Sequence, residues 1–167
     1  RVAADRVDIT TLATMQGALT SITDEMSQVV VRTARSPVFK LAKDFSCTLC
    51  DWQARQMIQG DAELPVHVGS IPFVCRAVAE AYEGDIASGD TFLCNDPAFG
   101  GLHLNDVALL RPVFVDGALL FWAVIRAHWL DVGGPSPADL RRAQSDSYGE
   151  GVRIPPLKII AADVPCD

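Results

Sequence analysis

Apolar side chains recur every three or four residues from Asp8 onward, and this spacing predicts a long amphipathic helix. The apolar stripe consists of Leu12, Met15, Leu19, Ile22, Met26 and Val29. Asp8 or Thr10 can cap its first turn. We expect the helix to end near Arg35, because Ser36 precedes Pro37 and a residue before proline is disfavoured in a helix. The chain therefore opens with one long helix.

A period of two replaces the helical period after Lys43–Asp44 and predicts a β-hairpin. Residues 45–50 alternate between two faces, and Gln56–Ile58 can return as the second strand. Cys47 and Cys50 have the spacing of metal knuckles and redox sites, but no second pair accompanies them. Residues three apart on a strand point to opposite faces, so we interpret both cysteines as ordinary strand residues.

A second helix is predicted after the loop Leu64–Ser70, with Ser70 as its N-cap. Its inward-facing residues are expected to be Ile71, Val74, Val78 and Ala81, and Gly84 is expected to end it. His67 would then lie just upstream of the helix. A histidine in such a position is more often a structural hydrogen-bond partner than a ligand or a base.

Two apolar runs around Asp116–Gly117 give the strongest hairpin signal in the chain. These predicted strands are Val107–Val115 and Ala118–Ala127, and a shorter strand, Thr91–Cys94, precedes them. Pro112 has no amide proton to donate, so we expect the first strand of the hairpin to lie at a sheet edge or to carry a bulge.

The last part of the chain is richer in turn residues than in strand or helix patterns. A helix is predicted from about Ala138 to Ser147, with Ser136 as its cap and Pro137 at its first position. The tail, Gly151–Asp167, contains one apolar patch at Leu157–Ile160. No complete domain is expected there.

These elements predict an α+β fold, in which the long N-terminal helix packs on a mixed or antiparallel sheet with β-hairpins. A length of 167 residues with 49% hydrophobic residues suits one domain. No apolar run reaches the roughly 18 residues that span a membrane, so we expect no membrane partner. The net charge is -7, with scattered basic residues, which disfavours nucleic acid as a partner. Five cysteines without a signal sequence favour free thiols in the cytoplasm.

The loop between the short strand and the hairpin contains the best candidates for metal ligands, His103 and Asp106. With a plain two-residue turn, the residue numbers of any two residues that face each other across the hairpin sum to 233. His128 is then diagonal to Asp106 and on the other face of the sheet. A three-residue loop, or a bulged residue near Pro112, makes the sum 234 and places His128 directly opposite Asp106. The segment between His103 and Asp106 must also bend, and Gly100–Gly101 makes such a bend plausible.

Two imidazoles and a carboxylate form the facial arrangement that holds zinc, manganese or iron with coordination sites open for water or substrate. Open coordination sites indicate a metal that takes part in a reaction rather than a purely structural one. The alternative is that His103 and His128 are loop histidines with ordinary hydrogen-bond partners and that Asp106 caps a turn. Spacing alone leaves this alternative open.

Five ordered motifs resemble the hydantoinase B/oxoprolinase family over nearly the whole chain. They are Asp44–Cys47, Pro65–Ser70, Asn95–Pro97 with Gly100–Asp106, Arg126–His128 with Asp131–Gly134, and Glu150–Pro156. The family includes subunits of ATP-dependent hydantoinases, 5-oxoprolinases, lactamases and ketone carboxylases. Its members are usually several hundred residues long, so residues 1–167 look like the N-terminal portion of such a domain.

The resemblance implies a metal-bearing catalytic component of a hetero-oligomer. In that arrangement, a hydantoinase A-type partner uses ATP to phosphorylate a small amide, lactam or ketone substrate, and this component completes hydrolysis or carboxylation at a divalent metal. The family's metal ligands match His103, Asp106 and His128. No phosphate-binding loop of the Walker type occurs here, so we do not expect this chain to bind ATP alone.

Further polar residues of the motifs are candidates for groups that contact the substrate or support the metal ligands. We assign candidate catalytic roles to His67, Asp131 and Arg126, while Asp44 and Asp96 are further possibilities. Trp129 stands where hydrolase-like members commonly have a second histidine, which favours a carboxylase-like or divergent substrate. Leu102 and Asn105 also replace the threonine and proline usual beside the ligand motif.

Two other functions remain open at the level of sequence. In one, the chain is a non-catalytic assembly module whose first helix docks a partner subunit and whose metal, if any, is structural. In the other, weaker reading, it is a stand-alone metal hydrolase.

Overall fold

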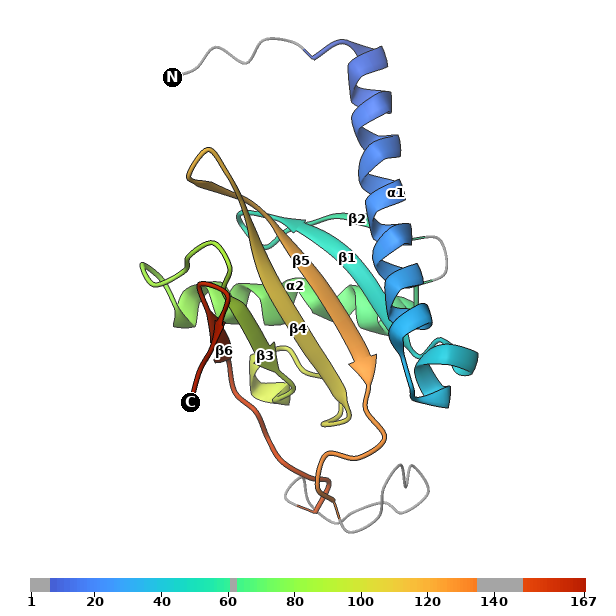
Figure 1. Ribbon diagram of the computed structural model, residues 1–167, viewed down its shortest axis with the longest axis vertical. Helices are drawn as coiled ribbons and strands as arrows, with labels where there is room; N and C mark the ends of the chain where they lie inside the picture. The colour runs from blue at the N-terminus through green and yellow to red at the C-terminus, as the bar shows by residue number, and fades with distance from the viewer. Residues whose placement is uncertain (1–6, 61–62, 135–148) are drawn as a thin grey trace.

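The computed structural model describes residues 7–60, 63–134 and 149–167, which form an antiparallel sheet with a long helix on either side (Figure 1). In the described ranges the sheet has seven strands in the order β2-β1-β5-β4-β3-β6-β7. The strands are β1 (Phe45–Asp51), β2 (Gln56–Gln59), β3 (Thr91–Cys94), β4 (Asp106–Val115), β5 (Ala118–His128), β6 (Leu157–Ala161) and β7 (Val164–Pro165). The long helices are α1 (Ile9–Thr33) and α2 (Pro65–Ala81), and the short helical segments are η1 (Val38–Ala42) and η2 (Pro97–Phe99). The predicted α+β class is confirmed, and the sheet is antiparallel rather than mixed.

The two long helices cover opposite faces of the sheet, and β1 contributes to both cores. Cys47 packs with Phe45 and Ala127 against residues of α1, among them Met26. Cys50 faces the other way and lies in the larger core beneath α2, which includes Ile71, Val74, Trp122 and Val124. Both cysteines are buried and free, and they lie on opposite faces of one strand, as the three-residue spacing predicts.

Helix α1 begins and ends close to the predicted positions, but most of its apolar stripe is not covered. Asp8 caps the first turn by accepting hydrogen bonds from the backbone amides of Thr10 and Thr11. The N-terminal half of the helix extends beyond the sheet (Figure 1). Stripe residues such as Leu12 and Met15 are consequently more than half exposed, at 57% and 51%.

Helix α2 starts six residues earlier than predicted, with Leu64 rather than Ser70 as its N-cap. Pro65 occupies its first turn, where a missing amide proton costs nothing, and Ser70 lies inside the helix. The Ser70 hydroxyl bonds back to the carbonyls of Val66 and His67 instead of capping the start. The prediction that His67 precedes the helix is therefore wrong, and His67 is a buried residue of its first turn. Ala81, expected to face inward, is exposed.

The hairpin of β4 and β5 has the two-residue turn Asp116–Gly117, with both residues at positive φ as this tight turn requires. One residue of β5, Leu120, has no partner in the ladder, because Phe114 pairs with Leu119 and Val113 pairs with Phe121. This bulge changes the sum of paired positions from 233 to 234 for the rest of the hairpin.

Strand β4 lies in the interior of the sheet, so the expectation of an edge strand at Pro112 is wrong. On one side Pro112 pairs with Trp122 of β5. On the other side the last pair between β3 and β4 joins Phe92 to Leu110, and Pro112 lies beyond that pair. The missing amide proton is therefore not needed by β3. A bulge does occur in this ladder next to Val113, but its extra residue, Leu120, belongs to β5, so the expectation that the first strand carries a bulge is wrong as well.

The C-terminal tail adds two strands that periodicity did not predict. The apolar patch Leu157–Ile160 falls in β6, which pairs with β3, and the short β7 follows it. The helix predicted at residues 138–147, with its cap at Ser136 and Pro137, lies outside the described residues. No helix in the described ranges combines the length and apolarity needed to cross a membrane.

Candidate metal centre

The loop from Asn95 to Asp106 folds back on itself because two consecutive glycines allow close backbone approach. Gly100 has a φ of +85°, and a Cβ on it would lie 2.6 Å from Phe73 and Val74 of α2. A Cβ on Gly101 would lie only 2.2 Å from the carbonyl oxygen of Asn95. Both positions therefore require glycine, and the loop is held tightly against α2 and the end of β3.

The predicted bend between His103 and Asp106 is a tight turn. The Asp106 amide donates a hydrogen bond to the His103 carbonyl at 2.9 Å, which brings both side chains to the same side. His103 Nε2 lies 3.2 Å from Asp106 Oδ2. The bulged hairpin pairs Asp106 with His128, and His128 Nδ1 lies 3.1 Å from Asp106 Oδ1.

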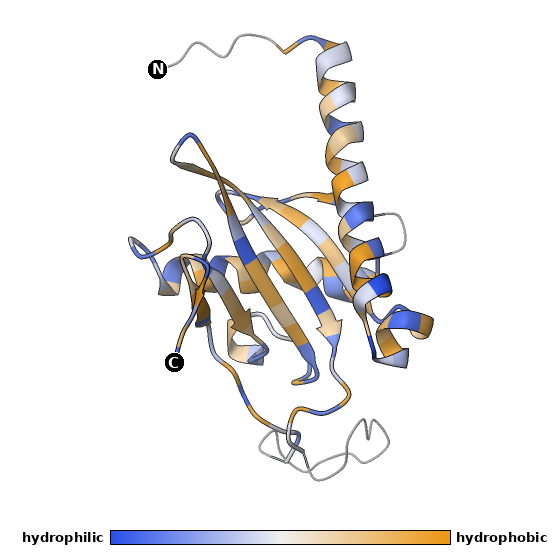
Figure 2. Cartoon of the chain, viewed as in Figure 1, coloured by the Kyte–Doolittle hydropathy of each residue, from blue (hydrophilic) through white to orange (hydrophobic). Residues whose placement is uncertain are grey.

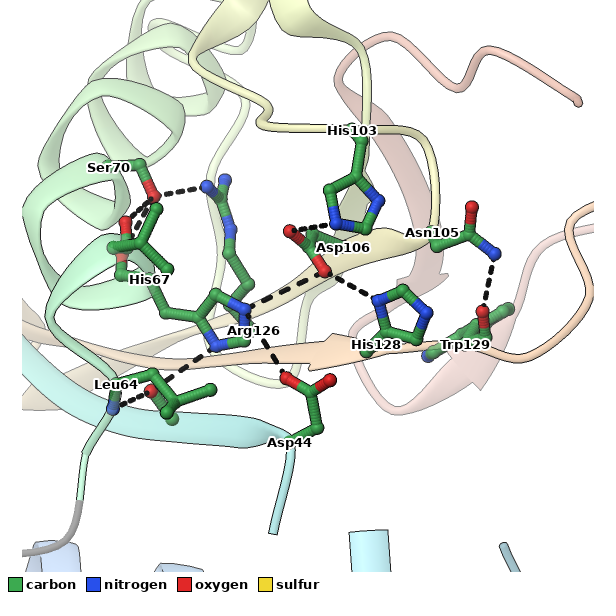
Figure 3. Close-up of polar contacts among 12 residues, drawn as sticks. Asp44, Leu64, His67, Ser70, His103, Asn105, Asp106, Arg126, His128 and Trp129 are labelled. Carbon is green, nitrogen blue, oxygen red and sulfur yellow. Dashed lines mark hydrogen bonds and ion pairs between the residues drawn. The ribbon is translucent and has the colours of Figure 1, made fainter. Parts of the chain in front are cut away.

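One potential ligand atom from each of His103, Asp106 and His128 lies within 4.8 Å of the other two (Figure 3). The centroids of the His103 and His128 rings are 5.0 Å apart, and the ring planes are inclined at 64°, an edge-to-face arrangement. Asp106 and His128 are buried, whereas the His103 side chain is 45% exposed. This set of two imidazoles and one carboxylate fits a divalent transition metal whose open coordination sites face solvent beside His103.

The environment of Asp106 favours its ionised form. Burial raises the pKa of this carboxyl, but the hydrogen bond with His67, the electrostatic interactions with His103 and His67, and the hydrogen bond with His128 outweigh burial. The pKa of Asp106 is consequently below its ordinary value. A carboxylate that is charged and partly desolvated is well prepared to bind a cation.

His67 enters the site from α2 and faces two carboxylates (Figure 3). Its Nε2 atom is 3.6 Å from Asp106 Oδ1 and 3.8 Å from Asp44 Oδ1. Its Nδ1 atom is 3.4 Å from the hydroxyl of Ser46. The backbone carbonyl of Asp44 in turn accepts the amide hydrogen bond of His128 at 3.0 Å. The earlier start of α2 thus places His67 beside the candidate metal ligands, a position that the helical pattern did not predict although the family resemblance made His67 a candidate.

Arg126 is fully buried behind the candidate ligands, and its hydrogen bonds are with the protein scaffold. Its guanidinium donates to the Ser70 hydroxyl of α2 and, at 3.0 Å, to the carbonyl of Gly100, while its Nε atom is unpartnered. Burial lowers the pKa of Arg126, and the negative charge of Asp106 acts in the opposite direction. The cation connects α2 to the glycine turn and offsets the charge of Asp106.

Asn95 and Asp96 connect the candidate site to the Glu150–Pro156 segment, a role that the sequence did not indicate. The buried Asn95 amide group donates to the carbonyls of Leu104 and Val152, and its oxygen accepts the amide of Ile154 at 2.6 Å. Asp96 accepts from Arg153 at 2.7 Å. These bonds explain why two motifs more than fifty residues apart belong to one structural unit.

Asp131 lies on the surface in a turn. Its carboxylate accepts the backbone amide of Gly133 at 2.8 Å, which is the bond of an Asx turn. Among the described residues, no recorded contact connects Asp131 with the three candidate ligands. The structure therefore places His67 beside the three candidate ligands and Arg126 against the glycine turn that precedes them, whereas Asp131 has no such contact among the described residues.

Comparison with known proteins agrees with this arrangement of motifs. The model of the hydantoinase B/oxoprolinase family matches residues 8–167. The chain belongs to this family. Caprolactamase subunit beta of Pseudomonas jessenii is 41% identical over 155 residues, which cover 93% of the chain and 26% of that subunit. The chain thus spans about a quarter of the length of this relative.

Two solved structures have the same fold. The crystal structure of the ATP-dependent caprolactamase from Pseudomonas jessenii matches 96% of the chain and 28% of its own chain, with a TM-score of 0.87 and 39% identity. The nucleotide-free structure of an acetone carboxylase matches 92% of the chain and 20% of its own chain, with a TM-score of 0.83 and 22% identity. At that identity the carboxylase supports the fold alone.

Proposed function

We propose that His103, Asp106 and His128 bind a divalent metal, and that this site completes an ATP-dependent hydrolysis of a cyclic amide. The observation that carries the proposal is the convergence of three ligand atoms within 4.8 Å on a tight turn and a bulged hairpin. Zinc, manganese and iron all suit two imidazoles and one carboxylate. Asp106 is the central ligand, because its two oxygens face the two different histidines.

A divalent metal in this position would supply Lewis-acid chemistry, polarising a carbonyl or phosphoryl oxygen. The protein residues have separate tasks around it. The exposed side of His103 gives access from solvent. Arg126 fixes the loop and offsets negative charge from within, so we propose that it supports the ligands without contacting the substrate. Asp131 remains a candidate substrate contact only if the substrate reaches the neighbouring turn.

Cyclic-amide hydrolysis is preferred to ketone carboxylation because of the relatives. The lactamase subunit is 41% identical to this chain, whereas the acetone carboxylase structure is 22% identical. We propose a lactam or a related ring amide as the substrate, which a hydantoinase A-type partner activates with ATP. The name of the relative, subunit beta, supports a hetero-oligomer.

Product analysis tests the reaction. The full-length protein, assembled with its ATP-binding partner, would be incubated with caprolactam or 5-oxoproline, with and without ATP and bicarbonate. We expect a ring-opened amino acid that depends on ATP and not on bicarbonate. A carboxylated product that requires bicarbonate would contradict the proposal and support the carboxylase alternative. Ring opening by this chain without ATP or partner would support a stand-alone hydrolase.

The uncovered apolar face of α1 favours a second role in assembly. A groove of about 310 Å³ beside this helix is lined by Ile22, Met26, Val29, Val30 and Ile125. Ile22 and Val29 are 45% and 58% exposed, and Figure 2 shows apolar residues along both the helix and the adjoining strands. We propose that a partner subunit packs here in the hetero-oligomer.

Co-purification tests this second role. Ile22→Glu and Val29→Glu should each weaken association with the ATP-binding partner, whereas Gln28→Glu, on a polar part of the same helix, should not. Unchanged association in both apolar variants would contradict docking on α1. Retained ATP-coupled turnover in a complex that carries His128→Ala would show that the metal site is structural rather than catalytic.

A further inference from the structure

Ser46 and His67 form a buried polar relay that ends at the candidate metal ligands. The Ser46 hydroxyl oxygen accepts the backbone amide of Leu64 at 3.0 Å and lies 3.4 Å from His67 Nδ1. Ser46 is fully buried on β1, and His67 is 2% exposed on α2. The relay therefore connects strand β1 and the start of α2 to the candidate metal site, and both of its side chains are shielded from solvent.

The hydrogen-bond inventory of this relay determines which nitrogen of His67 carries the proton. A serine hydroxyl has one proton to donate, and a buried hydroxyl needs an acceptor for it. Within the described residues, His67 Nδ1 is the recorded acceptor for that proton, since the other contact of the oxygen is with an amide donor. Nδ1 is then unprotonated, and the ring proton lies on Nε2.

The protonated Nε2 faces two carboxylates on opposite sides of the site. It lies 3.6 Å from Asp106 Oδ1 and 3.8 Å from Asp44 Oδ1, and Asp106 is itself 3% exposed. Both distances are longer than a hydrogen bond, so this N–H attracts the two carboxylates electrostatically over a short range. The His67 N–H beside Asp106 Oδ1 limits how the Asp106 carboxylate can rotate, and the other carboxylate oxygen, Oδ2, stays directed at His103.

We propose that His67 is a positioning residue, whose Nε2 proton, fixed by Ser46, orients the carboxylates of Asp106 and Asp44 for metal binding. This inference rests on the proposed function, because it assumes that Asp106 is a ligand. Partners that hold metal ligands in place commonly change metal affinity 10- to 100-fold when removed. His67 would act through Asp106 rather than on the substrate.

A neighbouring hydroxyl provides a matched control. Thr48 follows Ser46 on the same face of β1 and is also fully buried, and its hydroxyl has no hydrogen-bond partner among the described residues. Ser46→Ala removes the donor of the relay, whereas Thr48→Val removes a hydroxyl that holds nothing. His67→Gln retains an amide N–H that can point at the carboxylates, and His67→Ala retains none.

The test is metal binding by the full-length protein, measured as the Zn²⁺ dissociation constant in chelator competition and as the visible spectrum of the Co²⁺-substituted protein. We expect affinity to fall about 10- to 100-fold in His67→Ala, to fall less in Ser46→Ala and His67→Gln, and to be unchanged in Thr48→Val. The Co²⁺ spectrum should change in His67→Ala and Ser46→Ala, because the carboxylate ligand is no longer held in one orientation.

The outcomes separate this inference from the proposed function. Wild-type affinity and spectrum in His67→Ala, with metal lost in Asp106→Ala, would overturn the relay and leave the metal site in place. No metal binding by the wild type would overturn the proposed function itself. If His67→Ala fails to fold, Ser46→Ala compared with Thr48→Val decides the question, and equal affinity of these two variants would refute the relay.

Discussion

The substitution Gly101→Ala tests whether the loop that presents His103 and Asp106 depends on close backbone packing. A Cβ added at Gly101 would lie 2.2 Å from the Asn95 carbonyl oxygen and 2.7 Å from the backbone of Asp96. The first contact is about 1 Å short of ordinary van der Waals contact, and backbone atoms cannot rotate away. We expect a loss of about 1–3 kcal/mol in the free energy of unfolding, the range for an overpacked interior.

The assay is urea unfolding of the variant, together with its metal content, and Gly17→Ala is the matched control. Gly17 lies inside α1 with nothing within 4 Å of an added Cβ, so the same change should stabilise the protein by about 0.5–1 kcal/mol. Metal content should fall in Gly101→Ala alone. Equal stability of Gly101→Ala and the wild type would refute the tight loop as the basis of the site.

Two further pairs of variants test the hairpin register and the buried acid Asp90. Deleting Leu120, the unpaired bulge residue, should keep His128 opposite Asp106 and retain the metal. Deleting Ala123 from the same strand should instead shift the register and lose the metal. Equal metal content in the two deletion variants would contradict the register. Burial raises the pKa of Asp90, but amide hydrogen bonds and Lys158 lower it below the ordinary value. Its contribution to stability is therefore present above about pH 4 and is lost as pH falls through the lowered pKa. Asp90→Asn should flatten this acid limb in unfolding curves, and Asp116→Asn in the exposed turn should not.

The elements with strong local signals were predictable from the sequence. The cap and stripe of α1 and the Asp116–Gly117 turn follow from period and turn chemistry, whereas the pairing of Asp106 with His128 was one of two registers that the sequence left open. The bulge itself was foreseen as one of two ways to reach the sum of 234, but its position at Leu120 was not. A bulge depends on the twist of both strands, which no single residue of this sequence reports.

Features that depend on distant parts of the chain were not predictable. The start of α2 was placed at Ser70 because serine is a common cap, although Pro65 at the first turn was the better signal. His67 joins the site only because α2 packs across the sheet near β1. Strand β6 has no clear alternation, and it forms because β3 offers an unpaired edge. The apolar stripe of α1 is exposed because little of the sheet packs against it, and the sequence of the helix alone does not determine that packing.

The central claim is that His103, Asp106 and His128 bind a metal that the reaction requires. The most direct measurement is the metal content of the full-length complex, determined by elemental analysis for the wild type and for the three single alanine variants, with Asp131→Ala as the acidic control. We predict close to one divalent ion per site in the wild type and the control, and loss of the ion together with turnover in all three ligand variants. Unchanged metal content in His103→Ala and Asp106→Ala would contradict the account.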